Sequence, residues 1–298
     1  MTAQSEASLS GLVSTDWLAA NLSNPAVRIL DCTVEMHSQP VGLSQVISGR
    51  AQWAERHIPG AAYASMVEGF AQPGRARPYA FPDADVVSAT LQKLGVNRDT
   101  QIILYASGRH VTVTRVWWVL YSYGLRNIRI LDGGLEKWLR EGRPVESEVP
   151  QWPSGNAVAK LNPAFLANQA DVLSAIGRKD ICLLNALNPE QFFGSGGSHY
   201  GRPGRIPWSV NVPSRDLVDA GSGTFLGEAE IRSQFSKSGA LQAPKVIAYC
   251  GGGVAATAAA FALIHLGHPD VAVYDGSLAE WSSHAELPMV SGDIGPWG

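Results

Sequence analysis

Cysteine, charged residues and long apolar runs are all scarce in this sequence. Three cysteines occur in 298 residues, at positions 32, 182 and 250. Their wide separation and odd number exclude a disulfide framework, match no metal-ligand spacing and leave at least one free thiol. No apolar run approaches the roughly 18 residues that cross a bilayer. Residues 1–14 lack the basic and apolar regions of a secretory signal, so we expect a cytoplasmic protein with no membrane partner.

The charge balance argues against a further class of function. Charged residues make up 16% of the chain and the formal net charge is −3, whereas a nucleic-acid-binding protein carries a clustered basic excess. We therefore expect no nucleic-acid partner, although a local positive site for a small anion remains open. The chain is about twice a typical domain length and 45% hydrophobic, which predicts two domains with separate cores.

Two halves of the chain repeat the same motifs in the same order. An apolar run ends at Tyr105 and another at Tyr249, about 144 residues later, and a turn of small residues follows each. The segments 130–138 and 273–281 then share an Asp-Gly turn, a leucine and a tryptophan. A repeated unit explains this order.

The segment 143–163 separates the two copies. It carries four prolines and no sustained periodicity, a pattern typical of a linker of limited flexibility. We therefore predict one domain at residues 1–150 and a second at residues 151–298.

Short apolar runs alternate with helical patterns in each half. In the second half, the runs 181–184, 246–249 and 271–274 predict buried strands. The alanine-rich stretch 254–266, followed by Gly267, predicts a helix with a glycine just past its end. This alternation predicts an α/β fold in which a mainly parallel sheet is flanked by helices.

Cys250 follows a predicted strand and precedes a glycine-rich turn. The turn is Gly251–Gly253, and the predicted helix begins near Val254. Ligands of parallel sheets bind outside the carboxyl ends of the strands. The glycines let the backbone turn tightly with its N–H groups inward, and the helix dipole adds positive potential. Both favour an anionic, nucleophilic sulfur, or a second sulfur bonded to it.

Two other interpretations of Cys250 remain open at this point. Cysteine often packs as a small hydrophobic residue in a core. A glycine-rich turn between strand and helix also binds phosphate, although no Gly-Lys-Ser/Thr follows here. Cys32 and Cys182 lie in or just after apolar segments, and we predict that both are core residues.

Several motifs together resemble those of the tandem-domain rhodanese-type sulfurtransferases, which include the thiosulfate and 3-mercaptopyruvate enzymes. The resemblance covers roughly residues 10–292 and implies two rhodanese-like domains. The first domain is implied to be inactive, because Ala106 occupies the place of Cys250 in the repeat. The motifs are His57-Ile-Pro-Gly-Ala61, Arg115-Val-Trp-Trp118, Leu131-Asp-Gly-Gly134, Gly201-Arg-Pro-Gly-Arg-Ile-Pro207 with Asn211-Val-Pro213, Tyr249-Cys-Gly-Gly-Gly-Val254 and Tyr274-Asp-Gly-Ser277.

The resemblance also implies a two-step transfer of sulfane sulfur. The Cys250 thiolate attacks the outer sulfur of 3-mercaptopyruvate or thiosulfate, releases pyruvate or sulfite, and becomes a persulfide. A thiol or cyanide then accepts that sulfur. Neither a metal nor an organic cofactor is implied.

The loop after the cysteine departs from the family pattern. Thiosulfate enzymes usually carry basic residues there, and mercaptopyruvate enzymes usually carry a serine or threonine. This chain has Gly251, Gly252, Gly253, Val254 and Ala255. The loop side chains supply neither charge nor hydroxyl, so backbone amides and the helix terminus must supply most of the activation. The preferred donor stays open.

The substrate-binding arginine of the family falls at Leu187 in this chain. We expect Arg202 and Arg205 to replace it, with solvated surface positions as the alternative. His57 matches a first-domain histidine near the active cysteine of mercaptopyruvate-type members, and a histidine bound only to turn backbone is its alternative. Trp208 stands in place of a glycine, and we expect it to fill or reshape the mouth of the cleft.

Two further function classes fit parts of the sequence. A cysteine-dependent phosphatase needs an arginine that closes the loop on the phosphate. Ala255, Ala256 and Thr257 occupy those positions, which disfavours this class. A non-catalytic sulfur-binding or regulatory module remains the alternative, since the altered loop and Leu187 are consistent with lost turnover.

Overall fold

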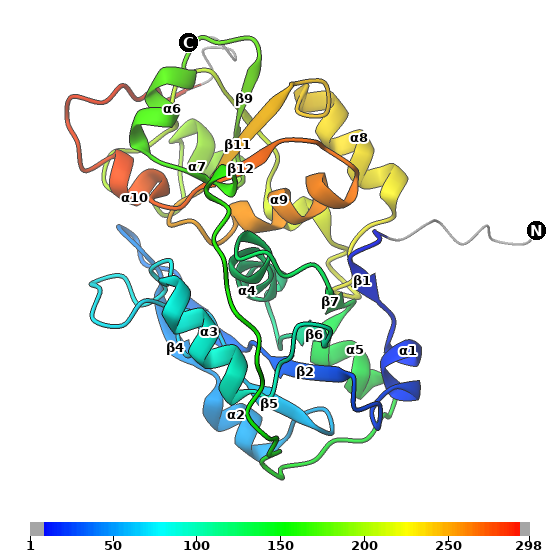
Figure 1. The fold of residues 1–298 in the computed structure, drawn as a ribbon. Coiled ribbons are helices and arrows are strands. Elements are labelled where there is room, and N and C mark those ends of the chain that lie inside the picture. Colours follow the sequence, from blue (N-terminus) through cyan, green and yellow to red (C-terminus); the bar gives the residue numbers. More distant parts are fainter. Residues whose placement is uncertain (1–8, 293–298) are drawn as a thin grey trace, which may run out of the picture.

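The computed structural model describes residues 9–292, which form two α/β domains placed one above the other in Figure 1. The sheet of the first domain has the strand order β1-β7-β6-β2-β5, and every pair in it is parallel. Its strands are β1 (Leu12–Val13), β2 (Val27–Asp31), β5 (Ala61–Tyr63), β6 (Gln101–Tyr105) and β7 (Ile128–Leu131).

The sheet of the second domain repeats this topology. Its order is β10-β9-β11-β12-β8, again with parallel pairs only. Its strands are β8 (Leu166–Ala167), β9 (Ile181–Asn185), β10 (Ser209–Asn211), β11 (Lys245–Tyr249) and β12 (Val271–Tyr274). The predicted strands at 181–184, 246–249 and 271–274 are confirmed.

Helices flank both sheets. The first domain has α1 (Thr15–Ala20), α2 (Arg50–Glu55), α3 (Ala84–Lys93), α4 (His110–Ser122) and α5 (Gly134–Arg140). The second has η1 (Pro163–Phe165), α6 (Gln169–Ala175), α7 (Pro189–Phe193), η2 (Ser214–Leu217), α8 (Glu228–Ser238), α9 (Ala256–His265) and α10 (Ser277–Trp281). The predicted α/β fold with two mainly parallel sheets is confirmed, and the helix expected at 254–266 is α9.

The domains meet along α4 and α9, which lie side by side at the junction (Figure 1). Small side chains on the alanine-rich α9 let the two helices approach closely. Thr114 and Thr257 share a hydrogen bond of 2.9 Å between their hydroxyls, and the rings of Trp117 and Phe261 meet edge to face. One buried apolar cluster extends through both domains, so the interface resembles a core rather than a contact between independent domains.

The linker is attached to the first domain along its length. The N–H groups of Gly155 and Ala157 donate to the carbonyls of Gln92 and Val96, and the Ala159 N–H donates to the Ser88 hydroxyl. The predicted boundary at residue 150 lies within this segment, between α5 and η1.

An antiparallel hairpin of β3 (Val34–His37) and β4 (Gln45–Ser48) extends from the first domain toward the second. Near its tip, the Gly42 N–H donates to the His199 carbonyl at 2.8 Å and the His199 N–H donates to the Pro40 carbonyl at 3.2 Å. The hairpin therefore joins the loop before Tyr200 and forms one side of the space between the domains.

Candidate active site

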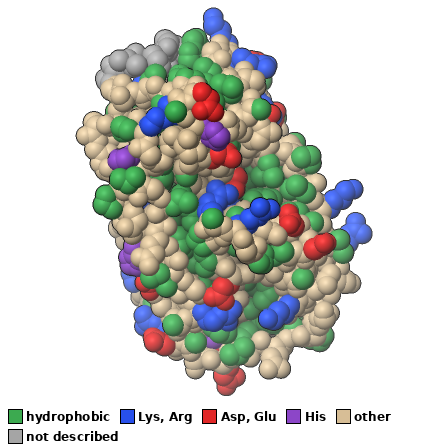
Figure 2. Space-filling view, turned by 90° about the vertical axis from the view of Figure 1, so that its left-hand side faces the viewer, with side chains coloured by type: hydrophobic (Ala, Val, Ile, Leu, Met, Phe, Trp, Pro, Cys, Tyr) green, Lys and Arg blue, Asp and Glu red, His purple; other side chains and the backbone are tan. Residues whose placement is uncertain are grey.

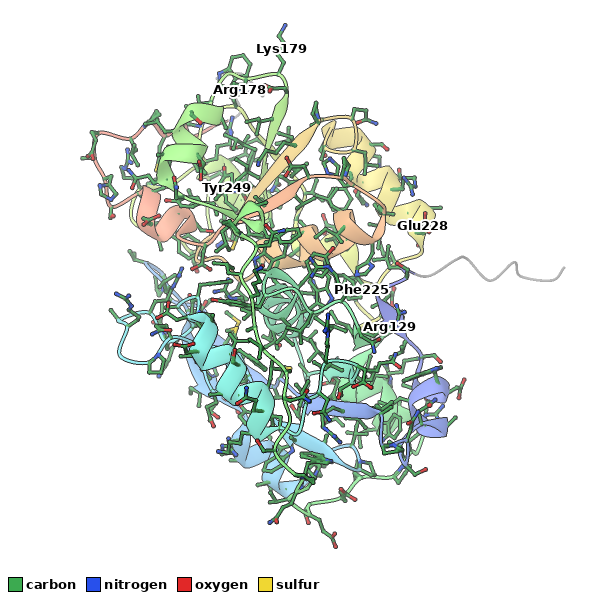
Figure 3. All side chains as sticks on the ribbon, viewed as in Figure 1. Arg129, Arg178, Lys179, Phe225, Glu228 and Tyr249 are labelled. Atoms are coloured by element: carbon green, nitrogen blue, oxygen red, sulfur yellow. The ribbon has the colours of Figure 1, made fainter. Side chains whose placement is uncertain are left out.

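Cys250 is the first residue after β11, at the carboxyl edge of the second sheet (Figures 1 and 3, where Tyr249 is labelled in Figure 3). Its side chain is only 2% exposed, yet it lines a cavity of about 350 Å³ between the domains. The carbonyls of Cys250 and Gly251 accept hydrogen bonds from the N–H groups of Leu278 and Ala279. These contacts fasten the start of the loop to α10.

The loop amides point to no partner within the described part of the chain. The N–H groups of residues 251–255 donate no hydrogen bond to a residue between 9 and 292. Successive backbone N–H groups with free donor capacity form a concave site for an anion. Backbone donors next to the Cys250 sulfur can therefore stabilise a thiolate or a persulfide.

Ser277 adds a hydroxyl to this site. Its Oγ accepts a hydrogen bond from the Cys250 N–H at 3.1 Å and lies 4.0 Å from the Cys250 Sγ. Ser277 adopts a φ of 51°, a left-handed conformation that is costly for a residue with a side chain. Such strain persists where surrounding contacts enforce it, and here it brings a hydroxyl to Cys250.

Two arginines of the first domain bind the loop that follows Cys250. Arg115, which is fully buried, donates to the Gly253 carbonyl at 3.0 Å and forms an ion pair with Asp275. Arg77 donates to the Gly252 carbonyl at 3.4 Å and also pairs with Asp275. These contacts fix the peptide planes of the loop, so the first domain shapes the surroundings of Cys250.

The glycine-only loop has a steric cause. A Cβ at Gly251 would fall 1.8 Å from Cζ of Tyr200. A Cβ at Gly252 would fall 2.4 Å from Cδ2 of Leu43 and 2.8 Å from the Tyr79 hydroxyl. Side chains from elsewhere thus occupy the space that loop side chains would need.

Tyr79 and Tyr200 bring two phenols to the cavity. Burial raises the pKa of Tyr200 to about 12, with the nearby Cys250 acting in the same direction. Burial also raises the pKa of Tyr79, and Cys250 contributes there too. Both phenols therefore stay protonated at neutral pH and can donate hydrogen bonds.

Both domains line the cavity. The first domain supplies the hairpin residues together with a tyrosine, an arginine and a valine: Met36, Ser38, Leu43, Ser44, Tyr79, Arg109 and Val111. The second domain supplies the cysteine loop, the segment from the end of β9 through α7 to Tyr200, and the start of η2: Ala186, Leu187, Asn188, Glu190, Gln191, Gly197, Ser198, Tyr200, Ser214, Cys250, Gly251, Gly252, Val254 and Ala255.

The structure corrects the expected placement of Arg202 and Arg205. The Arg202 guanidinium donates to the backbone carbonyls of residues 281, 282, 284 and 287. The Arg205 guanidinium stacks on Phe192 and donates to the Gly292 carbonyl at 2.9 Å. Neither arginine lines the cavity around Cys250, because each is directed toward the body of the second domain.

His57 and Trp208 also lie away from the cavity. The two ring nitrogens of His57 contact the carbonyls of Trp53 at 2.7 Å and Glu148 at 3.1 Å, and the ring stacks on Trp53. His57 is therefore bound to backbone carbonyls, as in the alternative interpretation of this residue. Trp208 adopts a φ of 64° and lies near Gly177, so the expectation that it shapes the cleft mouth is not met.

The remaining cysteines differ in burial. Cys32 is fully buried in the first core, as predicted, and burial raises its pKa well above the ordinary value. Cys182 lies in β9 and is partly exposed, and burial raises its pKa to about 12. Both thiols are therefore poorly ionised at neutral pH, which leaves Cys250 as the candidate nucleophile.

Sequence reasoning missed three polar residues of the cavity. Arg109 belongs to the first-domain loop that replaces the cysteine loop, and the resemblance implied only that this domain is inactive. Tyr79 and Tyr200 lie in irregular segments without periodicity. The signal in the sequence was the absence of side chains at residues 251–253, since three consecutive glycines imply neighbours that pack close to the backbone.

Fold and site together define a double α/β protein whose second sheet presents one cysteine to an interdomain cavity. The model of the rhodanese-like domain family matches residues 14–141 and again residues 168–284. The chain belongs to the rhodanese family, as a tandem member of its sulfurtransferase enzymes.

Named relatives agree with this assignment. The 3-mercaptopyruvate sulfurtransferase of Escherichia coli K12 is 29% identical over 281 residues, which cover 93% of this chain and 96% of that protein. The putative thiosulfate sulfurtransferase SseB of Mycobacterium tuberculosis is 33% identical over 249 residues, covering 82% and 86%. The crystal structure of the 3-mercaptopyruvate enzyme SseA from Escherichia coli matches with a TM-score of 0.76 at 27% identity, over 90% of this chain and 98% of that one.

Surface and helix properties complete the description. Basic and acidic side chains are intermixed on the face seen in Figure 2. Among residues 9–292, no helix combines the length and the apolar character that crossing a bilayer requires.

Proposed function

We propose that this protein transfers sulfane sulfur from 3-mercaptopyruvate or thiosulfate to a thiol or cyanide through a persulfide on Cys250. The observation that carries the proposal is the position of Cys250 beside unpaired loop amides, at a cavity lined by both domains. The cavity volume falls in the range of small-molecule sites. The names of the relatives support the two donors.

In the first step, the Cys250 thiolate attacks the outer sulfur of the donor. The bond from that sulfur to carbon (mercaptopyruvate) or to the sulfonate sulfur (thiosulfate) breaks, and its electron pair leaves with pyruvate enolate or sulfite. The enolate then takes a proton. In the second step, an acceptor thiolate or cyanide attacks the outer persulfide sulfur and restores the Cys250 thiolate.

The two domains have different roles in this proposal. Residues 151–298 form the catalytic domain, and residues 1–150 form an inactive domain that supplies a cavity wall and the Arg77 and Arg115 contacts to the loop. The cytoplasmic location expected from the sequence stays a prediction.

The test is mass spectrometry of the intact protein after incubation with each donor. Wild-type protein should gain the mass of one sulfur atom, and Cys250→Ser should gain none. Steady production of thiocyanate or of a thiol persulfide then separates an enzyme from a binding module. Absence of the adduct with both donors rejects the proposal, and an adduct without turnover supports the non-catalytic alternative.

A further inference from the structure

The proposed function leaves the recognition of the donor's anionic group without an assigned residue. Leu187, at the position of the family arginine, is an apolar part of the cavity wall. Arg202 and Arg205 are bound to the second domain elsewhere. The loop after Cys250 has no room for a basic side chain, because Tyr200, Leu43 and Tyr79 fill that space.

One positive side chain does face the cavity. Of the described residues that line it, Arg109 alone is a lysine, arginine or histidine. It comes from the first domain, directly before α4, and α4 lies at the domain junction (Figure 1). Its charge acts on the Tyr200 phenol across the cavity, opposing the effect of burial on the pKa of that phenol.

Arg109 also has free donors, unlike the other arginines near the catalytic loop. Arg77 and Arg115 bind loop carbonyls and Asp275. The Arg109 side chain forms no hydrogen bond or ion pair with another residue in the range 9–292, and it is exposed. An arginine with free donors presents a planar fork that matches a carboxylate or a sulfonate.

We propose that Arg109 binds the anionic end of the sulfur donor, so that the domain without a nucleophile determines the donor specificity of the other domain. The donor's sulfur then lies toward Cys250 and its carboxylate or sulfonate toward Arg109. The phenols of Tyr79 and Tyr200 lie beside the Cys250 loop, where they can donate hydrogen bonds to the same donor. This inference rests on the proposed function.

The test compares 3-mercaptopyruvate with its uncharged methyl ester as donors to full-length protein. The rate of Cys250 loading and kcat/KM are measured for both donors with wild type, Arg109→Ala and Arg109→Lys. Wild type should prefer the acid, and Arg109→Ala should lower the acid-to-ester ratio of kcat/KM about 10- to 100-fold, mainly through KM. Arg109→Lys should keep part of the preference.

A matched control removes the same charge elsewhere. Arg126 lies beyond the far end of α4 and donates to the carbonyls of Tyr121 and Leu125, so Arg126→Ala should keep the wild-type ratio. An unchanged ratio in Arg109→Ala, or no preference for the acid in wild type, overturns the inference. If wild type loads no sulfur from either donor, the proposed function itself fails.

Discussion

The two domains share one scaffold and differ at the residue that follows the central strand of each sheet. Cys250 follows β11 in the second domain, and Ala106 follows the equivalent strand β6 in the first. The same contact holds the last residue of each strand. The hydroxyls of Tyr249 and Tyr105 accept hydrogen bonds from the N–H groups of Ile206 and Ile58, respectively. The scaffold therefore does not require the nucleophile.

In the first domain, a carboxylate accepts hydrogen bonds from the loop that follows β6. Glu136 Oε1 accepts hydrogen bonds of 2.7 Å from the Ser107 hydroxyl and from the Gly108 N–H. The equivalent of Glu136 in the second domain is Ala279, which leaves the loop amides open. A vacant set of amides, as well as a thiol, therefore distinguishes the second domain from the first.

A second difference concerns backbone strain. Gly134 and Ser277 are equivalent and have similar left-handed φ values of 57° and 51°. Glycine adopts this conformation without strain, and a Cβ at Gly134 would lie 2.4 Å from the Ala106 carbonyl oxygen. Only the second domain tolerates a strained residue there, where the hydroxyl contacts Cys250.

The largest expected effect comes from exchanging the two key positions. The double variant Ala106→Cys, Cys250→Ala should carry no sulfur adduct in intact mass measurements, because Glu136 already occupies the Gly108 N–H. Adding Glu136→Ala should speed alkylation of the new thiol by iodoacetamide. A sulfur adduct on the double variant would show that the two loops are equivalent after all.

Removal of the Arg115 side chain should give the next largest effect. Arg115→Met leaves the Asp275 carboxylate with Arg77 only, and breaking a buried ion pair costs about 3–5 kcal/mol. We expect the free energy of unfolding, measured in urea, to fall by an amount near the lower end of this range. Sulfur should also load onto Cys250 more slowly. Adding Asp275→Asn should restore part of the stability, and no loss in Arg115→Met would contradict a role for this first-domain arginine in supporting the loop.

Two histidines at the domain junction should make stability sensitive to acid. Burial lowers the pKa of His110 and of His265 to about 4, from an ordinary value of 6.5. The folded state therefore binds protons less readily than the unfolded chain. The stability gained from neutral rings is fully present above pH 6.5 and is lost as the pH falls through 4, by roughly 1–3 kcal/mol for each ring.

Unfolding free energies measured between pH 7 and pH 4 test this expectation. His110→Gln removes a ring that meets Phe225 edge to face (Phe225 is labelled in Figure 3), and it should flatten the pH dependence. His265→Gln should do the same. The control His37→Gln, at an exposed hairpin position, should keep the wild-type slope, and equal slopes in all four proteins would refute the assignment.

The smallest effect concerns Ser277. Ser277→Gly relieves the positive φ but loses the hydroxyl, whereas Ser277→Ala loses the hydroxyl and keeps the strain. The alanine variant should be less stable than the glycine variant by about 1 kcal/mol, and both should load sulfur about tenfold more slowly than wild type. Loading at the wild-type rate would remove Ser277 from the active site.

Much of the fold was predictable from the sequence because its signals are local and repeated. The strand at 246–249, the glycine turn and the alanine-rich helix follow one another directly, so their order already placed Cys250 at a sheet edge. The apolar runs that end at Tyr105 and Tyr249, each followed by a turn of small residues, indicated the duplication. These features depend on periodicity and on turn residues, which sequence alone records.

The cavity chemistry was less predictable because it depends on the direction of side chains from distant segments. Arg202 lies in the expected loop, yet carbonyls near the end of α10 bind its guanidinium. Arg109 and Tyr79 reach the cavity only because α4 packs on α9 and the hairpin contacts the second domain. Tertiary packing determines such positions, and no local pattern signals them.

The contacts of Arg77 and Arg115 with the Cys250 loop also bear on how the two halves evolve together. A deletion of residues 1–150 would remove the side chains that bind the Gly252 and Gly253 carbonyls, together with one wall of the cavity around Cys250. Under the proposed function, selection for the activity of the second half therefore acts on these first-half residues as well. The half without a cysteine at this place is thereby tied to the half that carries Cys250.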